Sequence, residues 1–148
     1  MSERVEHVPA DEANKVWHRP LAHVVAGMLS GSTAQTPGMT RLEAISGKTV
    51  GSEKLWMGET HVAPSTNSGD HHHGEAETAI YVVSGTPRFV FLEDGEEKVF
   101  QTGPGDYIFV PPYTPHREEN PSADVPAVVV IARTTQEGIV VNLASLRG

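Results

Sequence analysis

Short segments rich in apolar residues recur along most of the chain, separated by polar residues, glycines and prolines. In several of these segments apolar and polar residues alternate, as in a β-strand with one buried face. The signal for helices is poor. This short, regular spacing is typical of an all-β sandwich or barrel. The expected strands are residues 21–28, 39–44, 55–62, 78–84, 87–92, 98–101, 107–110, 116–119, 127–133 and 139–143.

Turn-forming residues support this arrangement of strands. Asp94 and Gly95 stand between the expected strands 87–92 and 98–101, and an Asp-Gly pair readily adopts the positive φ angles of a tight hairpin. We therefore expect these two strands to pair in antiparallel fashion. The chain also holds 14 glycines and 11 prolines, a content that suits strands and turns better than helices.

The first 20 residues are polar and differ from the rest of the chain. We expect residues 1–20 to form an N-terminal arm, with a short helical turn over 10–15, and residues 21–148 to form one domain. The segment 125–132 is apolar throughout, which predicts a strand covered on both faces. The core would cover one face and a second subunit the other. We therefore expect a homodimer whose contacts involve the arm and residues 127–132.

Charge and composition exclude several classes of partner. The formal net charge is −8 and the isoelectric point is near 5.4, whereas nucleic-acid binding needs a basic surface. Cysteine is absent, so a bound metal would have to use histidine and carboxylate ligands. No apolar run approaches the roughly twenty residues of a membrane span, and the charged start lacks the apolar stretch of a signal peptide. We expect no nucleic-acid partner, no membrane partner and a cytoplasmic location.

Three consecutive histidines and a distant fourth carry the candidate chemistry. On an extended strand successive side chains point to opposite faces, so His71 and His73 can direct both rings to one point while His72 faces away. Glu77 and His116 could complete a set of nitrogen and oxygen ligands for divalent zinc, iron, manganese, nickel or copper. The same run could instead be a solvated loop that binds metal adventitiously. The histidine run alone does not decide between the two.

A second segment bears on this choice. His116 directly follows the proline-rich turn 111–115, where little backbone freedom remains and a side chain is held in place. Together the two segments resemble the two motifs of the cupin family. The matching residues are His71, His73, an acidic residue and Gly85 in the first motif, and Gly105, Pro111, His116 and Asn120 in the second.

The resemblance implies a cupin-type double-stranded β-helix, that is, a jelly-roll barrel, preceded by the N-terminal arm. It also implies one divalent metal ion per chain, bound by His71, His73 and His116, with Glu77 as the nearest candidate for the family's metal-binding glutamate. In the usual pattern that glutamate would fall at Thr78, so Glu77 stands one residue early. Glu77 then faces outward unless a β-bulge returns it to the interior, and without it the metal would have three histidines and water.

Two further positions matter for the site. Tyr113 stands where the family commonly has glycine, a change that affects the turn and no ligand. If His116 faces the interior, alternation turns Glu118 inward as well. Burying a lone carboxylate is costly unless it is paired or has chemistry to perform, so we take Glu118 as the candidate catalytic base. The alternative is that the strand ends at the rim and Glu118 is in water.

The wider chain resembles, more loosely, the small single-domain cupins of aromatic polyketide pathways, of the tetracenomycin and resistomycin cyclase type. Residues 36–41, 55–58 and 71–81 carry this similarity. It implies a metal-dependent, non-oxidative ring closure of a carbonyl-rich or aromatic small molecule. Two alternatives stay open: a dioxygenase whose metal is bound by three histidines, and a non-catalytic cupin that binds a metal or a small ligand.

Overall fold

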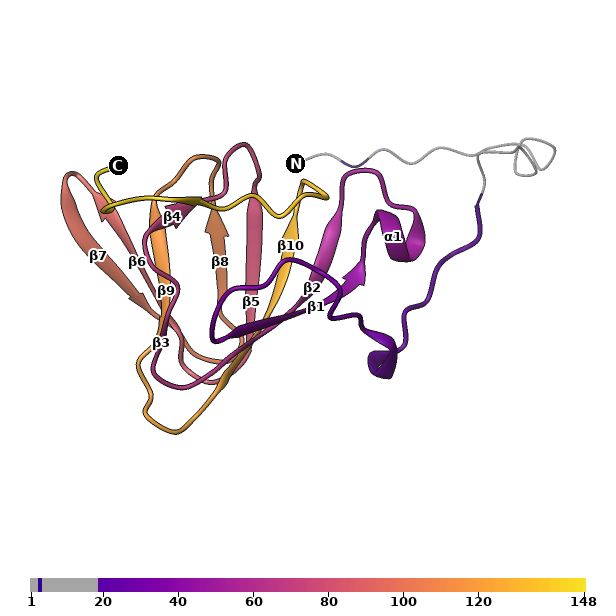
Figure 1. Cartoon of the computed structure of the whole chain (residues 1–148), viewed down its shortest axis with the longest axis horizontal. Helices are drawn as coiled ribbons and strands as arrows, with labels where there is room; N and C mark the ends of the chain where they lie inside the picture. The colour runs from indigo at the N-terminus through magenta and orange to yellow at the C-terminus, as the bar shows by residue number, and fades with distance from the viewer. Residues whose placement is uncertain (1–2, 4–18) are drawn as a thin grey trace.

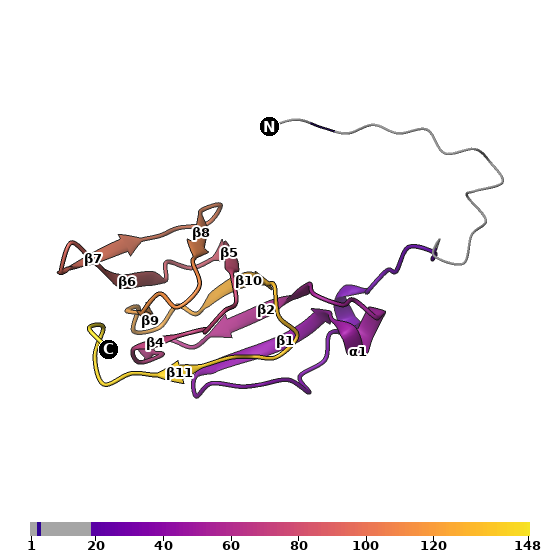
Figure 2. The ribbon, with the colours of Figure 1, turned by 90° about the horizontal axis from the view of Figure 1, so that it is seen from above.

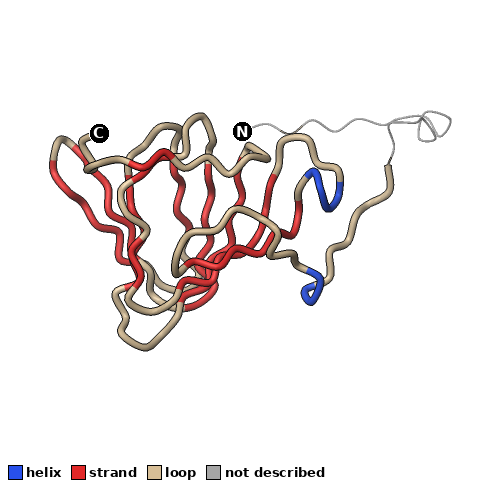
Figure 3. Tube along the Cα trace, in the orientation of Figure 1, coloured by secondary structure: helices blue, strands red, loops and turns tan. Residues whose placement is uncertain are grey.

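The computed structural model describes residues 3 and 19–148, and strands and loops make up nearly all of this part (Figure 3). Its helices are a single 3₁₀ turn, η1 (Ala26–Met28), and the four-residue α1 (Gly47–Val50). Neither has the length and hydropathy needed to cross a membrane. The predicted arm over residues 1–20, with its helical turn, lies almost wholly outside the described residues. The division into arm and domain therefore stays a prediction.

Two antiparallel sheets lie face to face and form the body of the molecule (Figures 1 and 2). The strand order is β1-β2-β10-β5-β8 in the first sheet and β11-β4-β9-β6-β7 in the second, where β3 also pairs with β9. This arrangement confirms the predicted all-β jelly roll. The strands are β1 (Met39–Ile45), β2 (Trp56–Val62), β3 (Thr66–Asn67), β4 (His71–His72), β5 (Thr78–Ser84), β6 (Arg88–Glu93), β7 (Glu96–Gln101), β8 (Tyr107–Val110), β9 (His116–Asn120), β10 (Ala127–Arg133) and β11 (Val141–Asn142).

The core lies between the sheets and is built from alternating strand positions. Ile80 and Val82 on β5, Val129 on β10 and Val110 on β8 pack against Phe89 on β6 of the other sheet. A shift of one residue in any of these strands would turn its apolar side chains into solvent. The same alternation that buries this core therefore also determines which polar side chains face the interior.

All but one of the predicted strands are present, most of them with bounds that differ by no more than two residues. The predicted hairpin is confirmed as well, since β6 and β7 pair in antiparallel fashion through Asp94 and Gly95, with φ angles of 54° and 79°. The strand expected over residues 139–143 shrinks to the two residues of β11.

The strand expected over residues 21–28 is wrong. Only η1 forms there, and the large apolar residues Leu21, Val25 and Met28 of the segment are exposed. Alternating apolar residues form a strand only where a neighbouring strand and an apolar surface receive them. Residues 19–148 offer the segment neither, and Figure 1 shows it (indigo) leading away from the sheets.

Candidate metal centre

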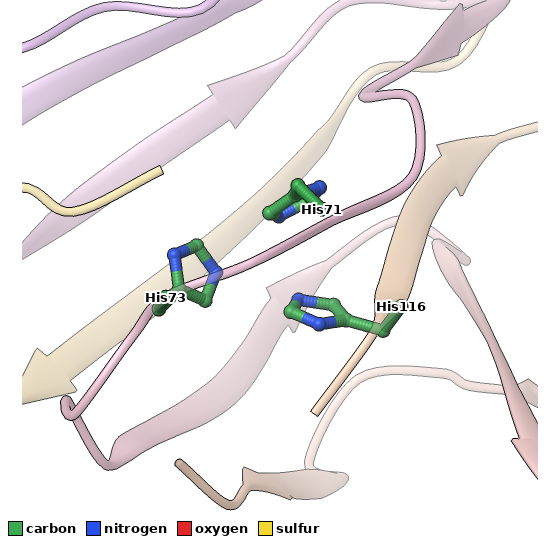
Figure 4. A group of neighbouring side chains, drawn as sticks. All are labelled: His71, His73 and His116. Carbon is green, nitrogen blue, oxygen red and sulfur yellow. The ribbon is translucent and has the colours of Figure 1, made fainter. Parts of the chain in front are cut away.

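Three histidines come together between the sheets. β4 pairs with β9 so that His71 lies opposite His116, and His73 follows β4 directly. Figure 4 shows the three rings facing one another. Their centroids are 4.5 to 5.1 Å apart, and one nitrogen from each ring lies within 4.8 Å of the others. The structure thus brings together the three histidines that the sequence predicts.

Backbone carbonyls set the orientation of all three rings. Because a carbonyl oxygen only accepts hydrogen bonds, each bonded Nδ1 carries the hydrogen and each Nε2 keeps a free lone pair. Metal-binding histidines are commonly held in this way, through the nitrogen that does not face the metal. The partners are the carbonyls of Gly69 for His71 at 2.8 Å, of Ile139 for His73 at 2.8 Å and of Thr114 for His116 at 2.9 Å.

Burial keeps these rings neutral near pH 7. Loss of solvent lowers the pKa of His71, and it lowers the pKa of His73 and of His116 to about 4. A histidine must be neutral to bind a metal, so no proton has to be removed at neutral pH. Three neutral nitrogens with free lone pairs at one point fit a divalent transition metal ion.

Glu77 is not part of this group. Its side chain is exposed, whereas Ala76 before it and Thr78 after it are buried. The bulge that could turn Glu77 inward is not found there, because the pairing of β5 with β10 is irregular only between Val128 and Val129, at the far end of β5. The interior position is instead occupied by Thr78. The structure therefore places three histidines at the site and turns the predicted fourth ligand towards solvent.

The neighbouring turn retains a conformation usual for glycine. Tyr113 has a φ of 59°, and its N–H donates to the Gly74 carbonyl at 2.8 Å. This left-handed conformation costs a non-glycine residue roughly 1 kcal/mol. The tyrosine ring lies 5.7 Å from that of His72, which stands outside the three-histidine group as predicted.

The histidines line a cavity of about 460 Å³, within the usual range of sites for small molecules. Its walls include Met39, Ile80 and Ile131 from the first sheet and the segment 138–140. Figure 1 shows the C-terminal segment (yellow) crossing one end of the sandwich above the sheets. The polar lining comprises Gln35, Thr36, Arg41, Ser68, Thr78, Glu118, Arg133 and Asn142 besides the histidines.

Glu118 lies two residues after His116 and shares its interior face. The side chain is buried, so it is not in water at a rim, and its Oε2 has no hydrogen-bond partner among the described residues. Burial raises the pKa of Glu118 to about 7, against the opposing effect of the positive charge of Arg41. An unpaired buried carboxylate is unfavourable for folding, which is typical of a group retained for chemistry.

Sequence reasoning missed two charged residues of the cavity. Arg41 follows Met39 by two positions on β1, so the alternation that buries Met39 also turns Arg41 inward. Arg133 is the last residue of β10 and lies with its Cζ 3.9 Å from the ring centroid of Trp56. The sequence carried a signal for both, because Arg133 likewise follows the inward positions Val129 and Ile131 on the expected strand 127–133.

The fold and the site together define a jelly-roll protein with a three-histidine metal site. The chain belongs to the cupin domain family, whose sequence pattern matches residues 58–133. Membership in this family and the histidine group identify a metal-dependent cupin.

Known proteins of different activities resemble the chain. It is 29% identical over 91 residues to 3-hydroxyanthranilate 3,4-dioxygenase of Cupriavidus pinatubonensis, a match that covers 59% of this chain and 48% of that enzyme. The polyketide cyclase RemF from Streptomyces resistomycificus superposes with a TM-score of 0.69 at 22% identity, over 85% of this chain and 87% of RemF. Oxalate decarboxylase from Bacillus subtilis superposes with a TM-score of 0.62 at 25% identity, over 74% of this chain and 28% of the decarboxylase. The chain thus spans about half of the dioxygenase.

Proposed function

We propose that this cupin is an enzyme that closes a ring in a carbonyl-rich or aromatic small molecule without oxidation, with Glu118 as the catalytic base. The observation that carries the proposal is the buried Oε2 of Glu118, which has no hydrogen-bond partner among residues 3 and 19–148 and lies on the cavity face beside His116. A barrel with a purely structural role would have no use for such a group.

A divalent ion held by His71, His73 and His116 would supply Lewis-acid polarisation of a substrate carbonyl. Glu118 accepts the proton from the carbon between two carbonyls, and the resulting enolate carbon attacks a second carbonyl of the same molecule, which forms the new carbon–carbon bond. The apolar walls hold the two reacting carbons together and keep water out. Glu118 then returns its proton to the oxygen of the attacked carbonyl, which leaves the enzyme unchanged.

A dioxygenase is the second candidate. The relative named 3-hydroxyanthranilate 3,4-dioxygenase shares 29% identity with the chain over 91 residues, and three neutral histidine ligands with open positions are compatible with oxygen chemistry. In that reaction oxygen would be consumed in proportion to product, whereas ring closure needs none. Oxygen dependence therefore separates the two functions.

The test is hydrogen exchange at carbon, because exchange reports proton removal even before the natural substrate is known. An aryl methyl ketone is incubated with the protein in D₂O without oxygen, and deuterium uptake is followed by NMR. We expect Glu118→Gln to slow exchange about a hundredfold or more while metal content stays the same. Glu119→Gln is the matched control, since Glu119 is next on β9 but bonds Arg88 and Arg117 instead of facing the cavity.

Exchange that is equally fast in wild-type protein and Glu118→Gln would overturn the role of Glu118. Oxygen uptake in step with turnover of a phenolic probe would move the assignment to the dioxygenase. If the metal is fully bound but the protein shows no hydrogen exchange at carbon and no oxygen uptake, the result would indicate a non-catalytic cupin.

A further inference from the structure

The two sheets contribute opposite kinds of charge to the cavity. His71, His116 and Glu118 come from β4 and β9 of the second sheet, whereas Arg41 and Arg133 come from β1 and β10 of the first. The cavity thus has a wall that carries the histidines and a carboxylate, and a wall that carries two guanidinium groups.

Each arginine is held by part of its guanidinium group. Arg41 donates through Nη1 to the Thr36 hydroxyl at 2.9 Å. Arg133 donates through Nε to the Thr135 carbonyl at 3.0 Å and through Nη2 to the Gln136 carbonyl at 2.9 Å. Nε and Nη2 of Arg41, and Nη1 of Arg133, have no hydrogen-bond partner within the described residues. Both groups are therefore fixed in position and still hold donors for a ligand.

The positive charge in the cavity is not balanced. Glu118 is the only carboxylate in the lining of this cavity, as far as the described residues go. Burial lowers the pKa of Arg41, and it lowers the pKa of Arg133 to about 10 with a smaller contribution from Arg41. The buried Glu43 lies outside the lining, where it accepts from Trp56 Nε1 at 2.8 Å and pairs with Lys48. Glu43 also acts on Arg133 from outside the lining, where its charge raises the pKa of Arg133 against the larger effect of burial. Even with Glu118 ionised, the described residues of the lining carry one more positive than negative charge.

We propose that Arg41 and Arg133 form a subsite for a carboxylate group of the substrate, whose apolar body lies against Met39, Ile80 and Ile131. A carboxylate accepts hydrogen bonds from two donors at once and matches the forked geometry of guanidinium groups. This inference rests on the proposed function only in that the same cavity receives the substrate. It narrows the substrate class to molecules with an anionic head and an apolar, carbonyl-bearing body.

The test uses benzoate and its neutral counterpart benzamide, with binding to the full chain measured by isothermal titration calorimetry before and after the metal is removed by a chelator. We expect benzoate to bind at least tenfold more tightly than benzamide in both forms. Arg41→Gln and Arg133→Gln should each weaken benzoate binding about ten- to hundredfold, as the loss of a charged hydrogen bond predicts. Benzamide binding should not change.

Two control variants distinguish loss of the subsite from misfolding of the protein. Arg41→Lys keeps the charge but loses the forked donors, so it should bind benzoate more tightly than Arg41→Gln and less tightly than the wild type. Arg88→Gln removes an arginine that bonds Glu119 outside the cavity, and it should leave benzoate binding unchanged. Circular dichroism checks the fold of each.

Unchanged benzoate binding in Arg41→Gln, or binding that disappears with the metal, would overturn the subsite. Neither result would affect the exchange test on Glu118. Conversely, benzoate selectivity that depends on both arginines, found together with no exchange at carbon, would leave the subsite standing and overturn ring closure.

Discussion

The Nδ1–H of His73 donates to the carbonyl of Ile139 at 2.8 Å. Ile139 precedes β11 in the C-terminal segment that lines the cavity, and β11 pairs with β4, so Val141 lies opposite His72. The Leu143 N–H also donates to the Asp70 carbonyl at 2.9 Å. The C-terminal segment therefore both encloses the cavity and determines which nitrogen of His73 faces the other two histidines.

Because the Ile139 carbonyl orients His73, we predict that Gly74→Ala weakens metal binding. Gly74 has a φ of 56°, and an added Cβ would lie 3.0 Å from Ile139 Cγ2, so the variant should displace the segment that holds His73. Loss of such an orienting contact typically lowers metal affinity ten- to hundredfold. Affinity is measured by competition with a chromogenic chelator.

Gly95→Ala is the matched control for this change. Gly95 has a φ of 79°, and no atom lies within 4 Å of the added Cβ, so the variant carries the backbone strain without the contact. Both variants should lose about 1 kcal/mol of unfolding free energy, but Gly95→Ala should keep its metal. Equal metal affinities in the two variants would contradict the role of Ile139.

We further predict that His73→Ala and His116→Ala each abolish stoichiometric metal binding and retain the β-type circular dichroism spectrum. Each change removes one of three nitrogens that lie within 4.8 Å of one another. The control is His72→Ala, which alters the neighbouring ring outside the group and should keep one ion per chain. Metal analysis is made on protein purified without a nickel column. Full metal content in both test variants would rule out this ligand set.

Glu77 provides a third prediction. Because its side chain is exposed and only the buried Thr78 faces the cavity, Glu77→Gln should leave metal affinity unchanged. Thr78→Glu should increase it, since that change puts a carboxylate on the interior position beside the histidines. The metal affinities of both variants are measured by competition with a chelator. A marked loss of metal in Glu77→Gln would mean that Glu77 moves inward when the ion binds.

The sequence predicts the parts of the fold that follow from alternation. β5, β9 and β10 bury every second residue, so their bounds and the inward direction of His116 and Glu118 could be inferred directly. Short pairings such as β4 carry no periodic pattern, because two residues are too few to show one.

Other features depend on contacts between distant segments. The Ile139 carbonyl reaches His73 through backbone atoms, which no side-chain pattern reveals. The Arg133 guanidinium group lies over the ring of Trp56 on the neighbouring strand β2, a contact that no pattern within a single strand reveals. The apolar segment 21–28 gives a strand-like pattern, yet the described chain provides it with no partner strand. Pattern alone therefore identifies the histidine ligands and the inward direction of the two arginines, but not the backbone carbonyls that orient the rings.

The last prediction is homodimerisation through the outer face of the first sheet. Val129 of β10 is fully buried in the core, and its neighbours Val128 and Val130 point the other way and stay only partly buried. On β8 of the same sheet, Tyr107 and Phe109 are exposed, and the Tyr107 ring lies 4.8 Å from that of Tyr81. A contiguous apolar sheet face of this kind favours association, and a two-fold dimer covers both copies at once.

Light scattering should therefore give twice the chain mass of 15.9 kDa at micromolar concentration. Phe109→Glu places a charge within the apolar face and should shift the protein to monomers, because burying an unpaired carboxylate in the interface is unfavourable. Phe100→Glu is the control, since Phe100 is also an exposed aromatic residue but lies on β7 of the second sheet. A wild-type monomer, or dissociation by both variants alike, would show that this face is not the dimer contact.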